Sequence, residues 1–158
     1  MAFPEAVERV SAYIRDAGAE ARIQEFPDGT HTAQDAADAV GCELAQIVKS
    51  LVFLVDGTPV MALVAGDNRL DEVKLAGVHG GGEVARADAD AVRAATGFPI
   101  GGVPPLGHAT ELAVYIDEDL LRWDEVWAAA GTWTDVFPLA PSELVRVSGG
   151  VVADLASR

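Results

Sequence analysis

The chain has 158 residues, half of them hydrophobic, which is enough for one globular domain with a substantial core. Its 25 Asp and Glu residues outnumber 11 Lys and Arg residues, giving a formal net charge of −14. That charge argues against binding of a nucleic-acid duplex, DNA included, through many phosphate contacts, but it leaves contact with one end of a nucleic acid through a few local cations open.

The first 40 residues predict two helices and a strand. Apolar residues recur at helical spacing from Pro4 to Asp16, and residues 22–26 alternate like a half-buried strand. A second helix is expected over residues 32–40, with Thr32 as its N-cap and Gly41 as its end.

The middle of the chain predicts a hairpin followed by short helices. The apolar run over residues 47–55 reads as a buried strand that turns through Asp56-Gly57-Thr58 into a strand over 60–65. Short helices are expected over residues 70–76 and 88–96, on either side of a strand near 83–85.

The last third predicts strands over residues 112–116 and 126–130 and a helix over 141–147 that starts with Pro141. Helices and strands alternate along the chain, but hairpins intervene. We therefore expect a single α/β domain, residues 1–158, with a mixed, strongly curved sheet.

Lys49 is unusual because it lies inside the apolar run 47–55. A lysine is almost never fully buried unless a group pairs with it. Two interpretations remain open: the side chain extends from the strand start into water, or its ammonium faces a pocket that takes an anionic ligand.

The segment from Gly101 to His108, with sequence GGVPPLGH, combines conformationally free glycines with rigid prolines. Glycine allows a ligand to approach the backbone closely, while proline fixes φ and removes amide donors. The remaining amides can bind a carbonyl or phosphate, although a plain connection between two strands is the alternative interpretation.

These features together resemble one protein family. Lys49-Ser50 opening an apolar strand, Thr96-Gly97-Phe98, and the GGxxPLG pattern of residues 101–107 are similar to YbaK-like aminoacyl-tRNA deacylases. These are relatives of the editing domain inserted in bacterial prolyl-tRNA synthetases. The resemblance begins near His31, so residues 1–30, with the N-terminal helix and strand, lie outside its clearest part.

The resemblance implies a barrel-like mixed sheet flanked by helices and a trans-editing deacylase that hydrolyses the ester of a mischarged tRNA. The 3′ end would be the only part of the tRNA that is bound, and no cofactor or metal would be required. Lys49 would hold the phosphate backbone, the backbone of Gly101 and Gly102 would cradle the ester, and Pro105 would shape the amino-acid pocket.

Further candidates for substrate binding follow from the same resemblance and from loop position. They are Ser50, His108, Gly131 and Trp133, with His31 and Thr30 at the pocket rim. Trp133 lies in a predicted turn, so it is the tryptophan expected to be exposed, whereas Trp123 and Trp127 are expected in the core.

The turn Gly131-Thr132-Trp133-Thr134-Asp135 departs from the Cys-tRNA(Pro) deacylases, which carry a basic residue there. Alanine, serine, threonine and cysteine all remain compatible as the amino acid removed.

Other chemistries find no support in the sequence. The chain has no Gly-x-Ser-x-Gly elbow, no P-loop and no metal-ligand spacing among its three histidines and Cys42. Acidic residues at 71–72, 117–119 and 124–125 are expected to be solvated helix caps.

The single cysteine fits a reducing compartment, and the N-terminus lacks a signal peptide, so we expect a cytoplasmic protein. No apolar run reaches the ~20 residues of a membrane span, so no membrane partner is expected. Two other functions stay open: a non-catalytic module that binds a nucleotide or a tRNA 3′ end, and a small-molecule acyl hydrolase on the same scaffold.

Overall fold

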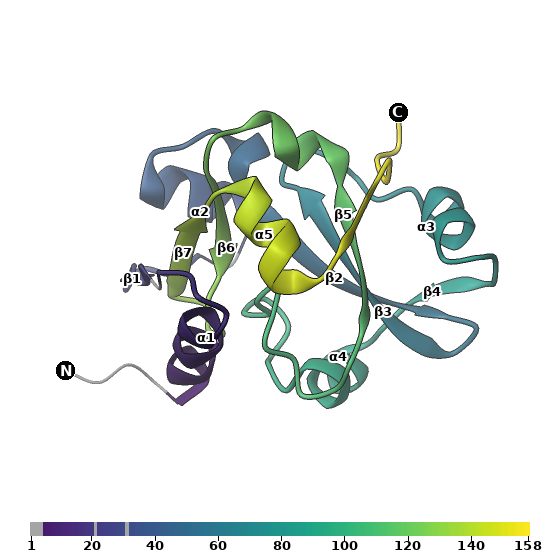
Figure 1. Ribbon diagram of the computed structural model, residues 1–158, viewed down its shortest axis with the longest axis horizontal. Coiled ribbons are helices and arrows are strands. Elements are labelled where there is room, and N and C mark those ends of the chain that lie inside the picture. The colour runs from purple at the N-terminus through teal and green to yellow at the C-terminus, as the bar shows by residue number, and fades with distance from the viewer. Residues whose placement is uncertain (1–4, 21, 31) are drawn as a thin grey trace.

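The computed structural model describes residues 5–20, 22–30 and 32–158 as an α/β domain with two sheets (Figure 1). The smaller sheet is antiparallel, with strand order β1-β7-β6, and the larger, mixed sheet has the order β4-β2-β3-β5-β8. The strands are β1 (Gln24–Glu25), β2 (Val48–Val55), β3 (Thr58–Ala65), β4 (Val84–Arg86), β5 (Ala113–Asp117), β6 (Val126–Ala129), β7 (Asp135–Leu139) and β8 (Val151–Ala153).

Helices surround these sheets, with α1 and α3 at opposite ends of the molecule in Figure 1. None of the described helices is long and apolar enough to cross a membrane. The helices are α1 (Glu5–Asp16), α2 (Ala33–Val40), α3 (Glu72–Val78), α4 (Ala89–Thr96) and α5 (Pro141–Ser148), with 3₁₀ turns η1 (Leu44–Gln46) and η2 (Glu118–Arg122).

The predicted α/β class and mixed sheet are confirmed, but the barrel-like closure is not. In the larger sheet β2 is antiparallel to β3 and β4, whereas β5 is parallel to both β3 and β8. Within the described residues, the two sheets are joined through one isolated bridge, Ile47 to Trp127, so they do not close into a barrel.

Local sequence signals explain the β2–β3 hairpin and α2. Asp56 and Gly57 both have positive φ (49° and 81°), which the tight turn between two antiparallel strands requires. Thr32 accepts a hydrogen bond from the Asp35 backbone N–H in a capping box, and Gly41 ends α2 in the left-handed conformation, as predicted.

Several elements were not predicted or were predicted too long. The strand expected over residues 22–26 is only two residues long, with both residues exposed, because it is an edge strand held by β7 alone. β7 was missed because it contains Pro138; that residue pairs with Trp127 of β6, beyond the reach of the short β1. The strand β8 and both 3₁₀ turns were also missed.

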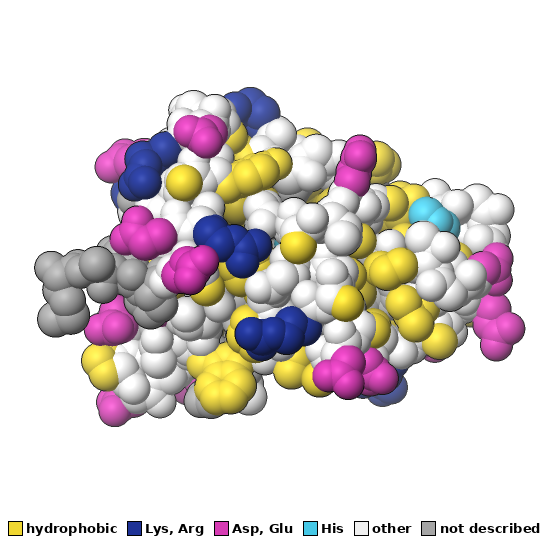
Figure 2. Space-filling view, turned by 90° about the horizontal axis from the view of Figure 1, so that it is seen from below, with side chains coloured by type: hydrophobic (Ala, Val, Ile, Leu, Met, Phe, Trp, Pro, Cys, Tyr) yellow, Lys and Arg dark blue, Asp and Glu magenta, His cyan; other side chains and the backbone are white. Residues whose placement is uncertain are grey.

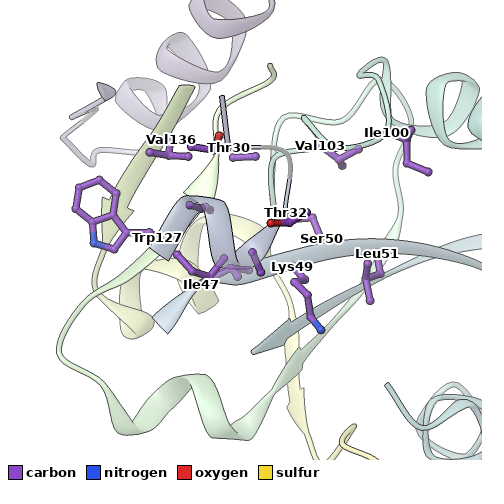
Figure 3. Close-up of a pocket in the computed structure, with 16 residues that line it drawn as sticks. Thr30, Thr32, Ile47, Lys49, Ser50, Leu51, Ile100, Val103, Trp127 and Val136 are labelled. Carbon is purple, nitrogen blue, oxygen red and sulfur yellow. The ribbon is translucent and has the colours of Figure 1, made fainter. Parts of the chain in front are cut away.

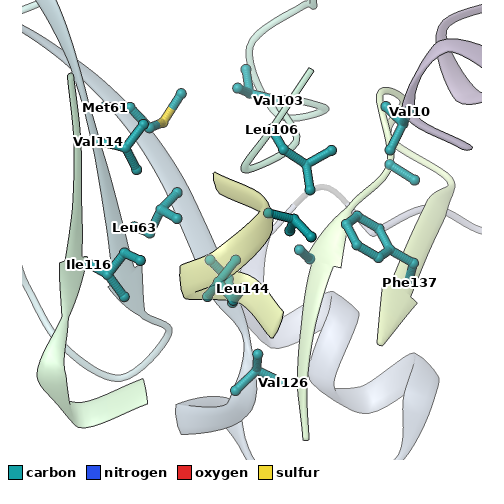
Figure 4. Close-up of a cluster of buried hydrophobic side chains, with 14 of the residues drawn as sticks. Val10, Met61, Leu63, Val103, Leu106, Val114, Ile116, Val126, Phe137 and Leu144 are labelled. Carbon is teal, nitrogen blue, oxygen red and sulfur yellow. The ribbon is translucent and has the colours of Figure 1, made fainter. Parts of the chain in front are cut away.

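The largest core cluster lies between the two sheets (Figure 4). Met61 and Leu63 of β3 face Phe137 of β7, and Leu144 of α5 packs between them; all are fully buried or nearly so. A second cluster on the other face of β2 and β3 includes Phe53 and packs against α3. Consequently β2 is covered on both faces over its second half.

The surface matches the acidic composition. Figure 2 shows acidic side chains spread over the face that it draws, interspersed with Lys and Arg side chains. The expectation that the acidic residues are solvated caps holds for Asp71, which accepts hydrogen bonds from the Val73 and Lys74 backbone N–H groups at the start of α3.

Asp117 contradicts that expectation because it is completely buried. Its Oδ2 atom accepts hydrogen bonds from the Ala65 N–H at 3.0 Å and from the Asn68 side chain at 2.9 Å. Its Oδ1 atom accepts from the Asp119 N–H at 3.0 Å. The carboxylate thus fixes the loop after β3 to the end of β5, because a buried polar group is retained where it is fully hydrogen-bonded.

We expect Asp117→Ala to lower the free energy of unfolding by about 1–3 kcal/mol or more, since the buried Ala65 N–H loses its acceptor. Urea unfolding monitored by circular dichroism measures this. Glu143→Ala, which removes an exposed carboxylate paired with Arg146, is the matched control and should change stability little. Equal losses for the two variants would contradict the structural role given to Asp117.

Candidate functional site

A cavity of about 310 Å³ opens where α2, the first half of β2, the glycine loop and strands β6 and β7 meet (Figure 3). Small and apolar side chains make up most of its wall, and its volume suits a small organic group. The lining residues are Thr30, Thr32, Ala33, Ala36, Ile47, Val48, Lys49, Ser50, Leu51, Ile100, Gly101, Val103, Trp127, Ala128, Ala129 and Val136.

The cavity lies beside an open stretch of strand edge on β2. β4 pairs only with residues 53–55 of β2, and Ile47 makes the bridge to Trp127. In the described part of the chain, no strand pairs with residues 49–52 on the side opposite β3. An unpaired strand edge presents backbone N–H and C=O groups that can bind an extended ligand.

Strand alternation places Lys49 and Ser50 on opposite faces of β2. Figure 3 shows Ser50 on the same side of the strand as Thr32, while the Lys49 amine and Leu51 lie on the other. Val48 and Val52, which share the Ser50 face, belong to the core cluster between the sheets. Ser50 and Lys49 therefore lie on the two opposite faces of β2, and these faces meet at the unpaired edge of the strand.

Ser50 is the polar group in the cavity that has no internal partner. Its Oγ atom is buried and makes no hydrogen bond to any described residue. By contrast, the Thr30 hydroxyl donates to the Trp133 carbonyl at 2.8 Å, and Thr32 Oγ1 accepts from the Asp35 N–H at 3.0 Å. Because an unpaired buried hydroxyl is costly, Ser50 is the group best placed to bond a polar ligand.

Lys49 is half-buried, and its ammonium donates a hydrogen bond of 2.5 Å to the Asn68 carbonyl. Burial lowers the pKa of Lys49 from its ordinary value, while the carboxylates of Asp67 and Asp117 oppose that shift. The ammonium is therefore held in place from one side and retains donors for an anionic ligand.

The glycine loop is shaped by a tight turn. The Gly102 N–H donates to the Pro99 carbonyl at 3.0 Å, and Gly101 has a φ of +90°, which a turn of this kind requires at its third residue. The expected pair of free amides is thus reduced to one: the Gly102 amide is occupied, whereas the Gly101 N–H makes no hydrogen bond to another described residue.

The 131–135 turn packs tightly against this loop. A Cβ on Gly102 would lie 2.9 Å from the backbone of Thr132, and one on Gly101 would lie 2.8 Å from Trp133 Nε1. The Trp133 indole is 48% exposed, as predicted, and donates a hydrogen bond of 2.9 Å to the Ile100 carbonyl. Trp133 therefore braces the loop from outside rather than lining the cavity.

Asp135 holds the 131–135 turn from inside. Its buried Oδ2 accepts hydrogen bonds from the hydroxyls of Thr132 and Thr134. Gly131 is buried with a φ of +103°, and a Cβ there would lie 3.1 Å from the Ala6 backbone and from the Phe98 ring, neither of which lines the cavity. It is thus a packing residue of the turn.

Two other predicted residues do not come to the cavity. Pro105 is buried in the loop, and the His108 Nε2–H donates to the Pro104 carbonyl at 2.7 Å, beside Tyr13 in a separate depression. Burial lowers the pKa of His108. His31 lies outside the described residues.

The cavity thus brings together Lys49, Ser50 and Gly101 of the predicted residues, with Thr30 at the rim. Sequence reasoning missed Trp127, which is buried as expected but also forms part of the cavity wall. It also missed the alanines of α2 and β6. The run Ala128-Ala129-Ala130 was the available signal, since small residues on a strand leave space beside it.

Apart from the Lys49 amine, the described lining of the cavity holds no acid–base group: it contains no carboxylate, imidazole or thiol. Among residues 5–20, 22–30 and 32–158, no group of three or more His, Cys, Asp or Glu side chains could hold a metal ion. Burial and the neighbouring Glu43 raise the pKa of the Cys42 thiol, which is therefore a poor nucleophile.

Comparison with known proteins identifies the fold. A solved structure described as a candidate trans-editing enzyme for prolyl tRNA synthetase is 44% identical with a TM-score of 0.93, covering 99% of this chain and 100% of that one. Another solved structure is 31% identical with a TM-score of 0.88, covering 94% of this chain and 99% of that one.

Similar sequences among curated proteins point to the same family. The chain is 41% identical over 107 residues to a proline–tRNA ligase of Maridesulfovibrio salexigens, covering 68% of this chain but only 18% of the ligase. It is 35% identical over 127 residues to the uncharacterized protein YwhH of Bacillus subtilis, covering 80% of each. The chain thus spans less than a fifth of the length of that ligase and four fifths of YwhH.

The family model for the aminoacyl-tRNA editing domain matches residues 27–147, which include α2, the Lys49 strand, the glycine loop and most of α5. The cavity lies wholly inside this range. The chain therefore belongs to the aminoacyl-tRNA editing domain family.

Proposed function

We propose that this protein is a trans-editing deacylase, which hydrolyses the ester between a wrong amino acid and the 3′ end of a tRNA in the cytoplasm. The observation that carries the proposal is the small cavity at the open edge of β2, where Ser50, Gly101 and Lys49 meet. A relative named as a candidate Cys-tRNA(Pro)/Cys-tRNA(Cys) deacylase from Enterococcus faecalis, 28% identical over 80% of this chain, supports it.

Each lining residue has a role on this proposal. The apolar wall takes the amino-acid side chain, and the free Gly101 N–H points a donor at the ester carbonyl. A preset donor of this kind stabilises the negative oxygen of the tetrahedral intermediate by roughly 2.7–4 kcal/mol. The Ser50 hydroxyl bonds a polar atom of the substrate, and the Lys49 ammonium pairs with a phosphate.

The absence of carboxylate, imidazole and thiol side chains from the described lining constrains the reaction. Ser50 has no base beside it and is therefore a weak nucleophile. We therefore assign the attack to water, whose oxygen bonds to the ester carbon as the C–O bond to the ribose breaks. The neighbouring ribose hydroxyl assists proton transfer, and the ribose oxygen ends protonated beside a free amino acid.

Release of each amino acid from a panel of mischarged tRNAs tests the proposal directly. We expect hydrolysis of at least one tRNA that carries a small amino acid. Binding of an aminoacyl-adenosine analogue with no hydrolysis across the panel would instead favour a binding module, and hydrolysis of simple acyl esters alone would favour a small-molecule hydrolase.

Lys49→Ala should reduce kcat/KM for the mischarged tRNA by about tenfold or more, since a charge-assisted contact to phosphate is lost. Lys74→Ala is the matched control: Lys74 is the only other lysine, it does not line the cavity, and its ammonium pairs with Asp154 at 2.9 Å. The Lys49 variant should melt close to the wild-type temperature. Activity within twofold of wild type, or a collapsed fold, would count against this role.

Gly101→Ala should lose most of kcat/KM, because its Cβ meets the Trp133 ring and a displacement of about 1 Å at the ester can cost 10²-fold. Gly149→Ala is a control with the same kind of backbone strain, since Gly149 has a φ of +68° but no neighbour within 4 Å. Both variants should lose about 1–2 kcal/mol of stability. If their activities per folded molecule are equal, the glycine loop is only a turn.

Chelating agents should leave deacylation unchanged, because the reaction as proposed uses no metal ion. Cys42→Ala should likewise retain activity, since the thiol is half-buried, has a raised pKa and bonds the Glu43 carbonyl. Assays after dialysis against a chelator, with and without added zinc, check this. Loss of activity that zinc restores would overturn the metal-free mechanism.

A further inference from the structure

A second depression, of about 660 Å³, lies on the Lys49 face of β2, between β4 and the start of α3. We call it the basic groove because it gathers cations from three separate segments: Lys49 of β2, Arg69 of the loop before α3, and Arg86 of β4. Its other lining residues are Leu51, Phe53, Leu70, Asp71, Glu72, Val73 and Ser157.

The two arginines of the basic groove are available for a ligand. Among the described residues, neither Arg69 nor Arg86 makes a side-chain hydrogen bond or an ion pair. Most other arginines of the chain are engaged: Arg22, Arg122, Arg146 and Arg158 all form ion pairs. Guanidinium groups left without partners beside a half-buried lysine form a site for an anion.

The local charge reverses that of the whole chain. Three cations line the basic groove against two carboxylates, whereas the full sequence has 11 cations against 25. One of the two carboxylates, Asp71, is occupied with capping α3, which leaves only the exposed Glu72 uncommitted. The potential of a groove can thus oppose the net charge of the molecule.

The basic groove is continuous with the cavity across the open edge of β2. A recess of about 120 Å³ lies between them, and it shares Ser50, Ile100 and Val103 with the cavity and Phe53 and Arg86 with the groove. Leu51 lines all three. A chain that enters the cavity with one end can therefore run over the strand edge into the groove.

We propose that the basic groove binds the sugar–phosphate backbone of the single-stranded 3′ end of the tRNA, on the 5′ side of the esterified nucleotide. This inference rests on the proposed function, and it adds Arg69 and Arg86 to Lys49 as phosphate ligands. From Lys49 to Phe53 the strand extends about 13 Å, given a rise of ~3.3 Å per residue. That length accommodates a few nucleotides and no duplex, which agrees with the acidic surface around it.

The test compares two substrates in the full-length protein. One is the mischarged tRNA, and the other is the same amino acid esterified to adenosine without a 5′ phosphate, which fills the cavity but cannot reach the groove. Arg69→Gln and Arg86→Gln should each lower the ratio of kcat/KM for tRNA to kcat/KM for the adenosine ester by about tenfold. The double variant should lower it further.

Salt dependence gives an independent readout. Each of the two variants should reduce the slope of log(kcat/KM) for tRNA against log[salt] by roughly 0.7, the value for one single-strand phosphate contact. Arg15→Gln is the control, because it makes the same charge change on α1, at the opposite end of the molecule. It should change neither the ratio of the two kcat/KM values nor the salt slope for tRNA. The proposal would be overturned if Arg69→Gln and Arg86→Gln left either the kcat/KM ratio or the salt slope at its wild-type value.

The failure of this inference can be told apart from failure of the proposed function. If the wild type hydrolyses neither substrate, deacylation is refuted, and binding of an uncharged oligonucleotide ending in CCA then tests the groove. Weaker binding by the double variant than by Arg15→Gln supports the groove, and equal binding refutes it. Hydrolysis of tRNA with no effect of the arginine variants refutes the groove alone.

Discussion

The incomplete pairing of β2 is the constraint on which the site depends. β4 pairs with only the last three residues of this strand, so among the described residues the stretch from Lys49 to Val52 has no strand paired with it on the side opposite β3. The period of two along a strand then sends the ammonium to one face and the Ser50 hydroxyl to the other. Two adjacent residues of β2 can thereby contact the two ends of a substrate that crosses the unpaired edge of the strand.

The opposite wall of the cavity depends on close contact between two loops. Gly101 and Gly102 allow the 99–103 turn to approach the backbone of Thr132, and the Trp133 indole closes over the turn from outside. The backbone N–H and side chain of Thr30 both bond the Trp133 carbonyl, which ties this assembly to the entry of α2. Three segments far apart in sequence therefore fix the position of the Gly101 amide.

Local chemistry in the sequence was enough to predict α2, the β2–β3 hairpin and α5, although β7, β8 and both 3₁₀ turns were missed. Thr32 with Asp35 and Gly41 defines α2, Asp56-Gly57 defines the hairpin, and Pro141 starts α5, because each signal acts within a few residues. Asp117 could not be understood in that way. Its burial results from a partner 52 residues earlier, the Ala65 N–H, and nothing in the sequence around Asp117 reveals that contact.

The candidate site shows the same division between local and long-range information. Lys49 and Gly101 were predictable because a lysine in an apolar run and a glycine in a Gly/Pro loop are locally anomalous. Trp127 and Ala36 were not, because an apolar wall residue has the same local pattern as a core residue. His108 was misplaced since sequence proximity to the loop does not determine the direction of its side chain, which the Pro104 carbonyl holds.

The composition of the cavity wall limits how the protein can discriminate between amino acids on the proposed function. Its volume of about 310 Å³ and its alanine-rich wall favour small side chains. An apolar pocket separates substrates that differ by one methylene by only about 1–3 kcal/mol, and it rejects an added hydroxyl just as weakly. A site with an unpaired hydrogen-bonding group discriminates far better, because that group stays unsatisfied when the wrong substrate binds. Ser50 is the buried hydroxyl of the described wall that lacks a partner, so the choice between alanine and a hydroxyl-bearing amino acid depends on this residue more than on the size of the cavity.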